Sequence, residues 1–192
     1  MGCVECKQNS KFLSGENLEF LMSCTRYDEA TIKELHKNFM KDCPTGQLTP
    51  DKFIDLYKTF ILRGNAEQYC EHVFRTFDTD QNGVIDFEEF LLAMYVTSSG
   101  TAEEKLTWAF RMYDVDGNGT IDPDEMLKVV RAIYGMRCEE ATEPTSVADE
   151  RARKIFRRMD ENGDGQLTEE EFLRGCLEDD ELSKLLAPNV VE

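Results

Sequence analysis

Three segments of the chain repeat an alternating pattern of oxygen-bearing side chains. Residues 78–89, 114–125 and 160–171 each begin with Asp, end with Glu and carry Asp, Asn or Thr at positions 3, 5 and 9. Ca²⁺ is a hard cation that takes about six to eight oxygen ligands, and a loop of this length supplies them from positions 1, 3, 5, 7, 9 and 12. The pattern therefore predicts three calcium sites. The predicted ligands are Asp78, Asp80, Asn82, Val84, Asp86 and Glu89; Asp114, Asp116, Asn118, Thr120, Asp122 and Glu125; and Asp160, Asn162, Asp164, Gln166, Thr168 and Glu171.

Two further positions in each loop support this interpretation. A glycine stands at position 6, where the chain must turn sharply and a Cβ would be in the way. An aliphatic residue stands at position 8, from which it points away from the metal and can pair with its counterpart in a neighbouring loop. A surface turn before a capped helix, of the form Ser/Thr/Asp-x-x-Glu, could produce part of this pattern once. Three complete copies favour calcium loops, whose last four residues also start a helix.

A fourth segment, residues 41–52, resembles these loops but lacks their ligands. Positions 1 and 12 are Lys41 and Lys52, and position 3 is Cys43. Two ammonium groups replace two required anions, so we expect no calcium here. In chain order this segment is the first loop, and those above are the second, third and fourth. Its expected role is structural, with Leu48 facing Ile85, as Ile121 should face Leu167 in the other pair.

Apolar residues at i, i+3 and i+4 flank all four loops, which is typical of amphipathic helices. The sequence thus predicts four helix–loop–helix units, or EF-hands. The predicted fold is all-α, with the hands in two pairs that form two lobes and with short two-stranded β contacts between paired loops. The N-terminal pair is assigned to residues 25–99 and the C-terminal pair to residues 100–178. Residues 1–24 and 179–192 are an N-terminal segment and a C-terminal helix and tail.

Composition narrows the functional classes. The net charge of −17 argues against a nucleic-acid partner. Eleven of the acids lie at predicted ligand positions, and three Ca²⁺ ions would reduce the charge to −11. The chain has two histidines, neither in a nucleophile motif, and no P-loop or dinucleotide fingerprint. We therefore expect that it is not an enzyme.

The inactive first loop resembles one protein family. The run from Asp42 to Gln47, Asp-Cys-Pro-Thr-Gly-Gln, is similar to the first loop of the neuronal calcium sensor family (the recoverin, visinin, neurocalcin and guanylate cyclase-activating protein group). The likeness covers roughly residues 20–180 and includes the run His72–Asp78 and the stretch Trp108–Phe110. It implies a groove in the N-terminal half that binds a target helix. The matching positions are Leu35, Phe39, Phe53, Leu56, Tyr57, Phe60, Ile61, Phe87, Phe90 and Met94.

The N-terminus predicts lipid attachment. Gly2 follows the initiator methionine and is a candidate for myristoylation. The run Met1–Lys7 also resembles the start of Src-family kinases, which implies palmitoylation at Cys3 and Cys6. One myristoyl chain binds membranes only marginally, and a second acyl chain makes anchoring stable. We expect the protein to lie at the cytoplasmic face of membranes, and to be partly cytosolic if it is not palmitoylated. An unmodified tail is the alternative.

These features together predict a membrane-anchored calcium sensor that binds three Ca²⁺ ions and regulates a target protein such as a cyclase, kinase, receptor or channel. Two other functions stay open at this point. The chain could be a calcium buffer, or a calcium-binding regulatory subunit of a larger enzyme. The acyl-acceptor N-terminus and the aromatic N-terminal half favour the sensor, and the inactive first loop disfavours the fixed subunit.

Overall fold

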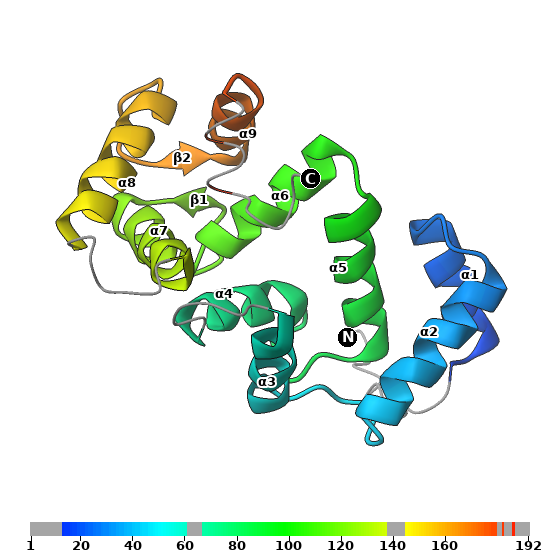
Figure 1. The fold of residues 1–192 in the computed structure, drawn as a ribbon. Coiled ribbons are helices and arrows are strands. Elements are labelled where there is room, and N and C mark those ends of the chain that lie inside the picture. The colour runs from blue at the N-terminus through cyan, green and yellow to red at the C-terminus, as the bar shows by residue number, and fades with distance from the viewer. Residues whose placement is uncertain (1–12, 61–66, 138–144, 180–181, 183–185, 187–192) are drawn as a thin grey trace, which may run out of the picture.

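The computed structural model describes residues 13–60, 67–137, 145–179, 182 and 186 (Figure 1). Nine helices and two short strands occur in this part of the chain. They are α1 (Gly15–Cys24), α2 (Glu29–Asp42), α3 (Pro50–Phe60), α4 (Glu67–Phe77), α5 (Phe87–Ser99), α6 (Ala102–Tyr113), β1 (Thr120–Ile121), α7 (Pro123–Arg137), α8 (Thr145–Met159), β2 (Leu167–Thr168) and α9 (Glu169–Leu177). Each loop joins two helices, so the predicted all-α fold of four hands is confirmed.

The loops pair as the position 8 residues predict. In the C-terminal pair, β1 and β2 are antiparallel, and Ile121 lies opposite Leu167. In the N-terminal pair, Leu48 and Ile85 form a β-bridge in which each N–H donates to the other's carbonyl at 2.8 and 2.9 Å. All four side chains are buried. The inactive first loop therefore holds the second loop through backbone hydrogen bonds.

Two of the exit helices, α5 and α9, begin at capping boxes. The Asp86 side chain accepts from the N–H of Glu89, while the Glu89 carboxylate accepts from the N–H of Asp86. Thr168 and Glu171 repeat this exchange at α9. Because a capping box satisfies two of the unpaired N–H groups at a helix start, it fixes where the helix begins. Glu89 and Glu171, which close the second and fourth loops, are thus held by the helices they start.

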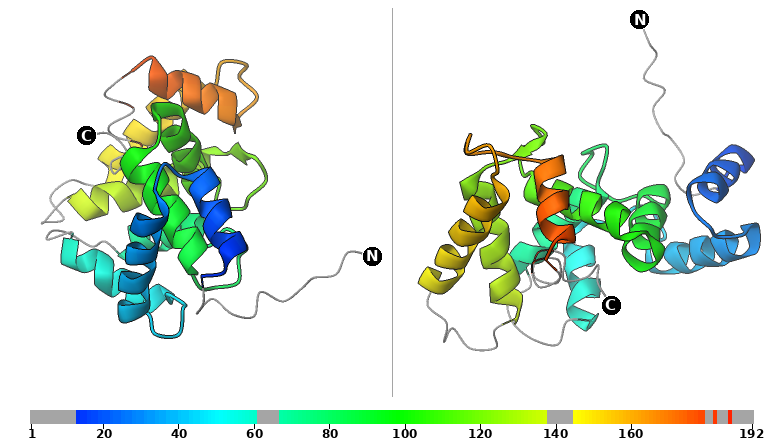
Figure 2. Two further views of the ribbon diagram at one scale, coloured as in Figure 1. Left: turned by 90° about the vertical axis from the view of Figure 1, so that its right-hand side faces the viewer. Right: turned by 90° about the horizontal axis from the view of Figure 1, so that it is seen from above.

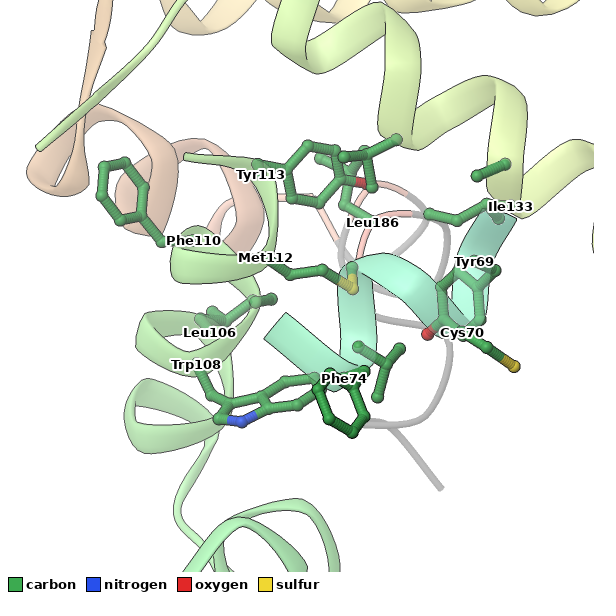
Figure 3. Packing of buried hydrophobic residues seen from close by; sticks show 14 of the residues in the cluster. Tyr69, Cys70, Phe74, Leu106, Trp108, Phe110, Met112, Tyr113, Ile133 and Leu186 are labelled. Carbon is green, nitrogen blue, oxygen red and sulfur yellow. The ribbon is translucent and has the colours of Figure 1, made fainter. Parts of the chain in front are cut away.

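The two pairs of hands contact each other through helix α4. Helix α4 of the N-terminal pair packs against α6 and α7 of the C-terminal pair (Figures 1 and 2). Figure 3 shows Phe74 of α4 with Trp108 and Met112 of α6 in one buried cluster. The ring of Trp108 also contacts Phe77 edge-to-face, with centroids 5.8 Å apart. A continuous apolar core therefore connects the second hand to the third.

Both ends of the described chain pack on these hands. Helix α1, inside the predicted segment 1–24, packs on α2 and α5. The Asn17 side-chain amide donates to the Glu88 carboxylate at the start of α5. Near the C-terminus, Leu182 and Leu186 are buried, and Figure 3 shows Leu186 near Tyr113 of the third hand. Among the described residues, every helix is too short or too polar to span a bilayer.

Candidate calcium sites

The aspartate at position 1 organises each active loop. Asp78 accepts from the N–H of Asn82 at 3.0 Å and from that of Gly83 at 2.9 Å. Asp114 accepts in the same way from Asn118 and Gly119, at 3.0 and 2.9 Å. In the fourth loop, the carboxylate of Asp160 accepts from Gly163 at 2.8 Å and Gly165 at 3.1 Å. The backbone curls around this carboxylate in all three loops.

Positions 5 and 7 form a second common contact. The N–H of the residue at position 7 donates to the side-chain oxygen at position 5. The three pairs are Val84 to Asn82 at 2.9 Å, Thr120 to Asn118 at 2.8 Å and Gln166 to Asp164 at 2.8 Å. This bond holds the position 5 oxygen in place.

The glutamate at position 12 ties the end of the second and third loops to their start. Glu89 Oε1 accepts from the N–H groups of Thr79 and Asp80 at 2.9 and 3.2 Å, and Oε2 accepts from Asp86 at 3.1 Å. Glu125 repeats this arrangement, and Glu171 Oε2 accepts from the N–H of Thr168 at 2.9 Å. All three glutamates are buried. The second and third loops are therefore closed around their own carboxylates.

Two loops gather three carboxylates into one space. The oxygens of Asp78, Asp80 and Glu89 lie within 4.8 Å of one another, and those of Asp114, Asp116 and Glu125 do the same. Such an all-oxygen donor set fits a hard divalent cation such as Ca²⁺. In the part of the chain that the structure describes, these are the two groups of this kind.

The fourth loop differs at position 3, where Asn162 replaces an aspartate. The Asn162 amide donates to the Asp164 carboxylate at 3.0 Å. Its three acids, Asp160, Asp164 and Glu171, do not form a group like the other two loops. The fourth loop thus shares the hydrogen-bonded framework of the other two but holds fewer carboxylates together.

The pKa values of Glu89 and Glu171 are shifted in opposite directions. Burial raises the pKa of Glu89, and the neighbouring charges of Asp86 and Asp80 raise it further. A hydrogen bond from the Thr168 backbone holds the pKa of Glu171 below its usual range. Keeping the buried Glu89 ionised beside other carboxylates costs free energy. A bound divalent cation would neutralise these carboxylates and so relieve that cost.

The first loop has no comparable site. Cys43, at position 3, is buried in the core, and burial raises the pKa of its thiol. Its carbonyl accepts from the N–H of Gly46, which has φ 77° at the turn. Cys43 therefore packs as an apolar residue.

One residue that shapes the second loop was missed by sequence reasoning. Gln81 has φ 57° at position 4, in the left-handed region that glycine prefers. Gly117 and Gly163 occupy the same position in the third and fourth loops, with φ 72° and 71°. Those two glycines were the available signal, because they mark position 4 as left-handed in every active loop.

The predicted groove residues lie in two aromatic clusters. Phe39 contacts Phe87 and Phe90 between α2 and α5, with ring centroids 5.6 and 5.2 Å apart. Phe53 stacks on Tyr57 of α3 and contacts α4. Phe39, Phe53 and Phe87 are buried, Leu35, Tyr57, Phe90 and Met94 are half-buried, and Leu56 is 36% exposed. The groove stays a prediction, because calcium would have to expose these rings.

Several predicted residues lie outside the described part of the chain. They are the acylation candidates Gly2, Cys3 and Cys6 and the groove residue Ile61. Phe60 ends α3, but its side chain is also outside the description.

Comparisons with known proteins agree with this geometry. Residues 44–97 and 103–177 each match the EF-hand domain pair. Neuronal calcium sensor 1 of Lymnaea stagnalis is 45% identical over 175 residues, covering 90% of this chain and 91% of that protein. Human recoverin is 39% identical over 178 residues, covering 91% and 89%, and chicken (Gallus gallus) visinin is 34% identical over 181 residues, covering 92% and 94%. Given this likeness along nearly its whole length, the chain belongs to the neuronal calcium sensor family of EF-hand proteins.

Proposed function

We propose that the chain is a membrane-anchored calcium sensor that binds one Ca²⁺ ion in each of the second, third and fourth loops and regulates a target protein. The observation that carries this proposal is the gathering of carboxylates in the second and third loops. The matching backbone framework around Asp160 and Glu171 extends it to the fourth loop.

The number of ions is tested by native mass spectrometry and calorimetric titration. We expect three ions for the unmodified chain and two for each of Glu89→Gln, Glu125→Gln and Glu171→Gln, because bidentate ligation needs both carboxylate oxygens. The matched control is Lys52→Gln at position 12 of the first loop, which should leave three. A count of two that Glu171→Gln does not change would remove the fourth loop from the proposal.

A sensor must change its surface, whereas a buffer need not. Sensor EF-hands open on binding calcium and expose an apolar groove. The two aromatic clusters of the N-terminal pair supply apolar rings that such an opening could expose. We expect the protein to bind phenyl resin with calcium and to elute with chelator. Equal retention under both conditions would favour the buffer.

Target binding is tested by calcium-dependent capture from membranes. We expect the target to present an amphipathic helix, since helix-in-groove recognition suits an apolar groove. Leu56→Asp changes the exposed groove residue on α3 and should weaken capture. Leu177→Asp, at a leucine on α9 that is 50% exposed, is the control and should not.

Membrane anchoring depends on residues 2, 3 and 6. We propose constitutive attachment to the cytoplasmic face, because two or more acyl chains hold a protein stably. Cell fractionation should find the protein in the membrane fraction with calcium or with chelator. Gly2→Ala should move it to the soluble fraction. Release of most of the unmodified protein by chelator alone would contradict constitutive anchoring.

A further inference from the structure

Arg75 belongs to the second hand, but its side chain binds the third. It lies on α4, three residues before Asp78, and is half-buried. Its Nη1 donates to the carbonyl of Val115 at 2.6 Å, and its Nη2 donates to that of Met112 at 2.7 Å and, more weakly, to that of Arg111 at 3.4 Å. The guanidinium thus spans the end of α6 and the start of the third loop.

The third loop creates the need for these donors. If α6 continued, the carbonyls of Arg111 and Met112 would accept from the N–H groups of Val115 and Asp116. Those two N–H groups instead donate to Glu125 Oε1, at 2.8 and 3.1 Å. The helix therefore ends with carbonyls that have lost their partners to a predicted calcium ligand. Arg75 supplies replacement donors from another helix.

The charge and shape of Arg75 suit this place. The C-terminus of a helix carries partial negative charge, so a cation is favourable there. Burial lowers the pKa of Arg75, but the neighbouring Asp114 and Glu125 charges oppose that effect. The planar guanidinium presents its donors in a rigid fork, whereas a lysine ammonium has the charge without the fork.

The same contact brings the two loops together. Arg75 and Arg111 line a cavity of about 160 Å³ whose walls also include Asp78 and Asp114, the first residues of the two loops. Because α4 leads directly into the second loop, a shift of the end of α4 would also move the guanidinium that binds the third.

The geometry points to Arg75 as a positioning residue for the third calcium site. By satisfying the carbonyls at the end of α6, it leaves the N–H groups of Val115 and Asp116 free to orient Glu125. Calcium in the second loop, by ordering the end of α4, then favours binding in the third loop. This inference rests on the proposed binding of calcium by both loops.

The test is a calcium titration of the full chain in two backgrounds. Glu171→Gln removes the fourth site, and Glu171→Gln with Glu89→Gln removes the second site as well. The coupling is the Kd of the third loop without the second site, divided by its Kd with the second site intact. We expect it to be about fivefold with Arg75 present, the low end of typical allosteric coupling. With Arg75→Met or Arg75→Lys it should fall to about one.

The control is Arg111→Met. Arg111 has the equivalent place before the third loop, three residues ahead of Asp114, is exposed and lines the same cavity. Its substitution should leave the ratio unchanged. If Arg75 had only a structural role, its substitution would weaken calcium binding by the third loop equally in both backgrounds. The ratio of the two Kd values would then stay unchanged.

Three results would overturn the inference: a ratio of one with Arg75 present, a ratio kept by Arg75→Met, or a ratio kept by Arg75→Lys, which would make charge alone sufficient. Failure of the third loop to bind calcium would appear separately, as a missing ion in the unmodified chain. That result would overturn the proposed function and the inference with it.

Discussion

Gln81 is the residue at which the second loop departs most from its neighbours. A side chain at positive φ costs about 1–2 kcal/mol, because its Cβ approaches the following carbonyl. The third and fourth loops avoid that cost with Gly117 and Gly163. The second loop therefore carries local strain next to a group of carboxylates that a cation would stabilise.

Replacing Gln81 with a β-branched residue should raise this strain. We expect Gln81→Val to lower the free energy of unfolding by about 1 kcal/mol in chelator, measured by urea denaturation. Gln81→Gly should be close to neutral, because relief of strain is offset by the greater entropy of the unfolded chain. The control, Gln166→Val, changes an exposed loop residue outside the positive-φ group. Equal losses for the two valine variants would contradict strain at Gln81.

His72 makes stability depend on pH. Burial, with the nearby charges of Arg75 and Lys128, lowers its pKa to about 4. In the unfolded chain the pKa of His72 is about 6.5, so the unfolded chain binds the proton more tightly than the folded one. The stability that neutral His72 contributes is therefore fully present above pH 6.5 and is lost as the pH falls toward 4.

We expect His72→Gln to flatten this dependence. Between about pH 7 and 4.5 the unmodified protein should lose about 1–2 kcal/mol more stability than the variant, a figure reduced for partial solvent screening. Urea denaturation in chelator at each pH measures it. His36→Gln, at a site where burial also lowers the pKa, should have a smaller effect. Parallel curves for the His72 variant and the unmodified chain would refute the prediction.

Among the connecting elements, the link between α5 and α6 has the tightest constraint at Gly100. Its N–H donates to the carbonyl of Val96 at 3.0 Å, and a Cβ at Gly100 would lie 2.5 Å from that same oxygen. The contact is with backbone, which has little freedom to give way. The constraint is close approach, since φ here is an ordinary −65°.

Gly100→Ala should therefore disturb the end of α5. We expect a loss of about 1–3 kcal/mol in the free energy of unfolding, as for other overpacked sites. Gly15→Ala is the matched control, because a Cβ there meets nothing within 4 Å. It should be neutral or stabilising by up to about 1 kcal/mol. Thermal and urea unfolding in chelator compare the two, and a neutral Gly100→Ala would show that the α5 end can shift freely.

At the level of elements, the sequence predicted what local rules decide. The Thr168–Glu171 capping box starts α9, as the loop pattern predicted, because this signal acts within one turn. The pairing of Ile121 with Leu167 was also predictable, since the loop geometry fixes where position 8 points. The reach of Arg75 to α6 was not predictable, because it depends on how two distant helices pack.

For the whole molecule, charge is the dominant global feature. The net charge is −17, and eleven acids lie in three short loops. Like charges repel and destabilise the compact state, and salt screens that repulsion. Calcium in the loops would remove part of the same repulsion directly.

Salt should therefore stabilise the calcium-free protein more than the calcium-loaded one. Raising KCl from roughly 0.05 to 0.5 M shortens the Debye length from about 14 to about 4 Å. We expect a clear rise in the unfolding temperature in chelator and a smaller rise with calcium. A control with sucrose separates screening from general stabilisation, because sucrose acts through exclusion from the surface. Equal salt responses in both states would contradict the idea.

The placement of the two pairs was the largest gap in the sequence prediction. The two pairs of hands were predicted, but the contact between them was not: one buried cluster includes both Phe74 of α4 and Met112 of α6. An apolar stripe shows that a helix is covered on one side, and it does not show which helix covers it. The contacts of α4 with α6 and α7 therefore needed the structure.

Trp108 lies at this junction, and it is the chain's one tryptophan. Its indole is buried, touches Phe77 just before the second loop, and has an Nε1–H for which no hydrogen-bond acceptor is found in the described structure. Tryptophan fluorescence, excited at the red edge of the absorption band, would thus report on a single site between the second and third hands. The protein carries its own optical probe of whether these hands move against each other, and no label is needed to use it.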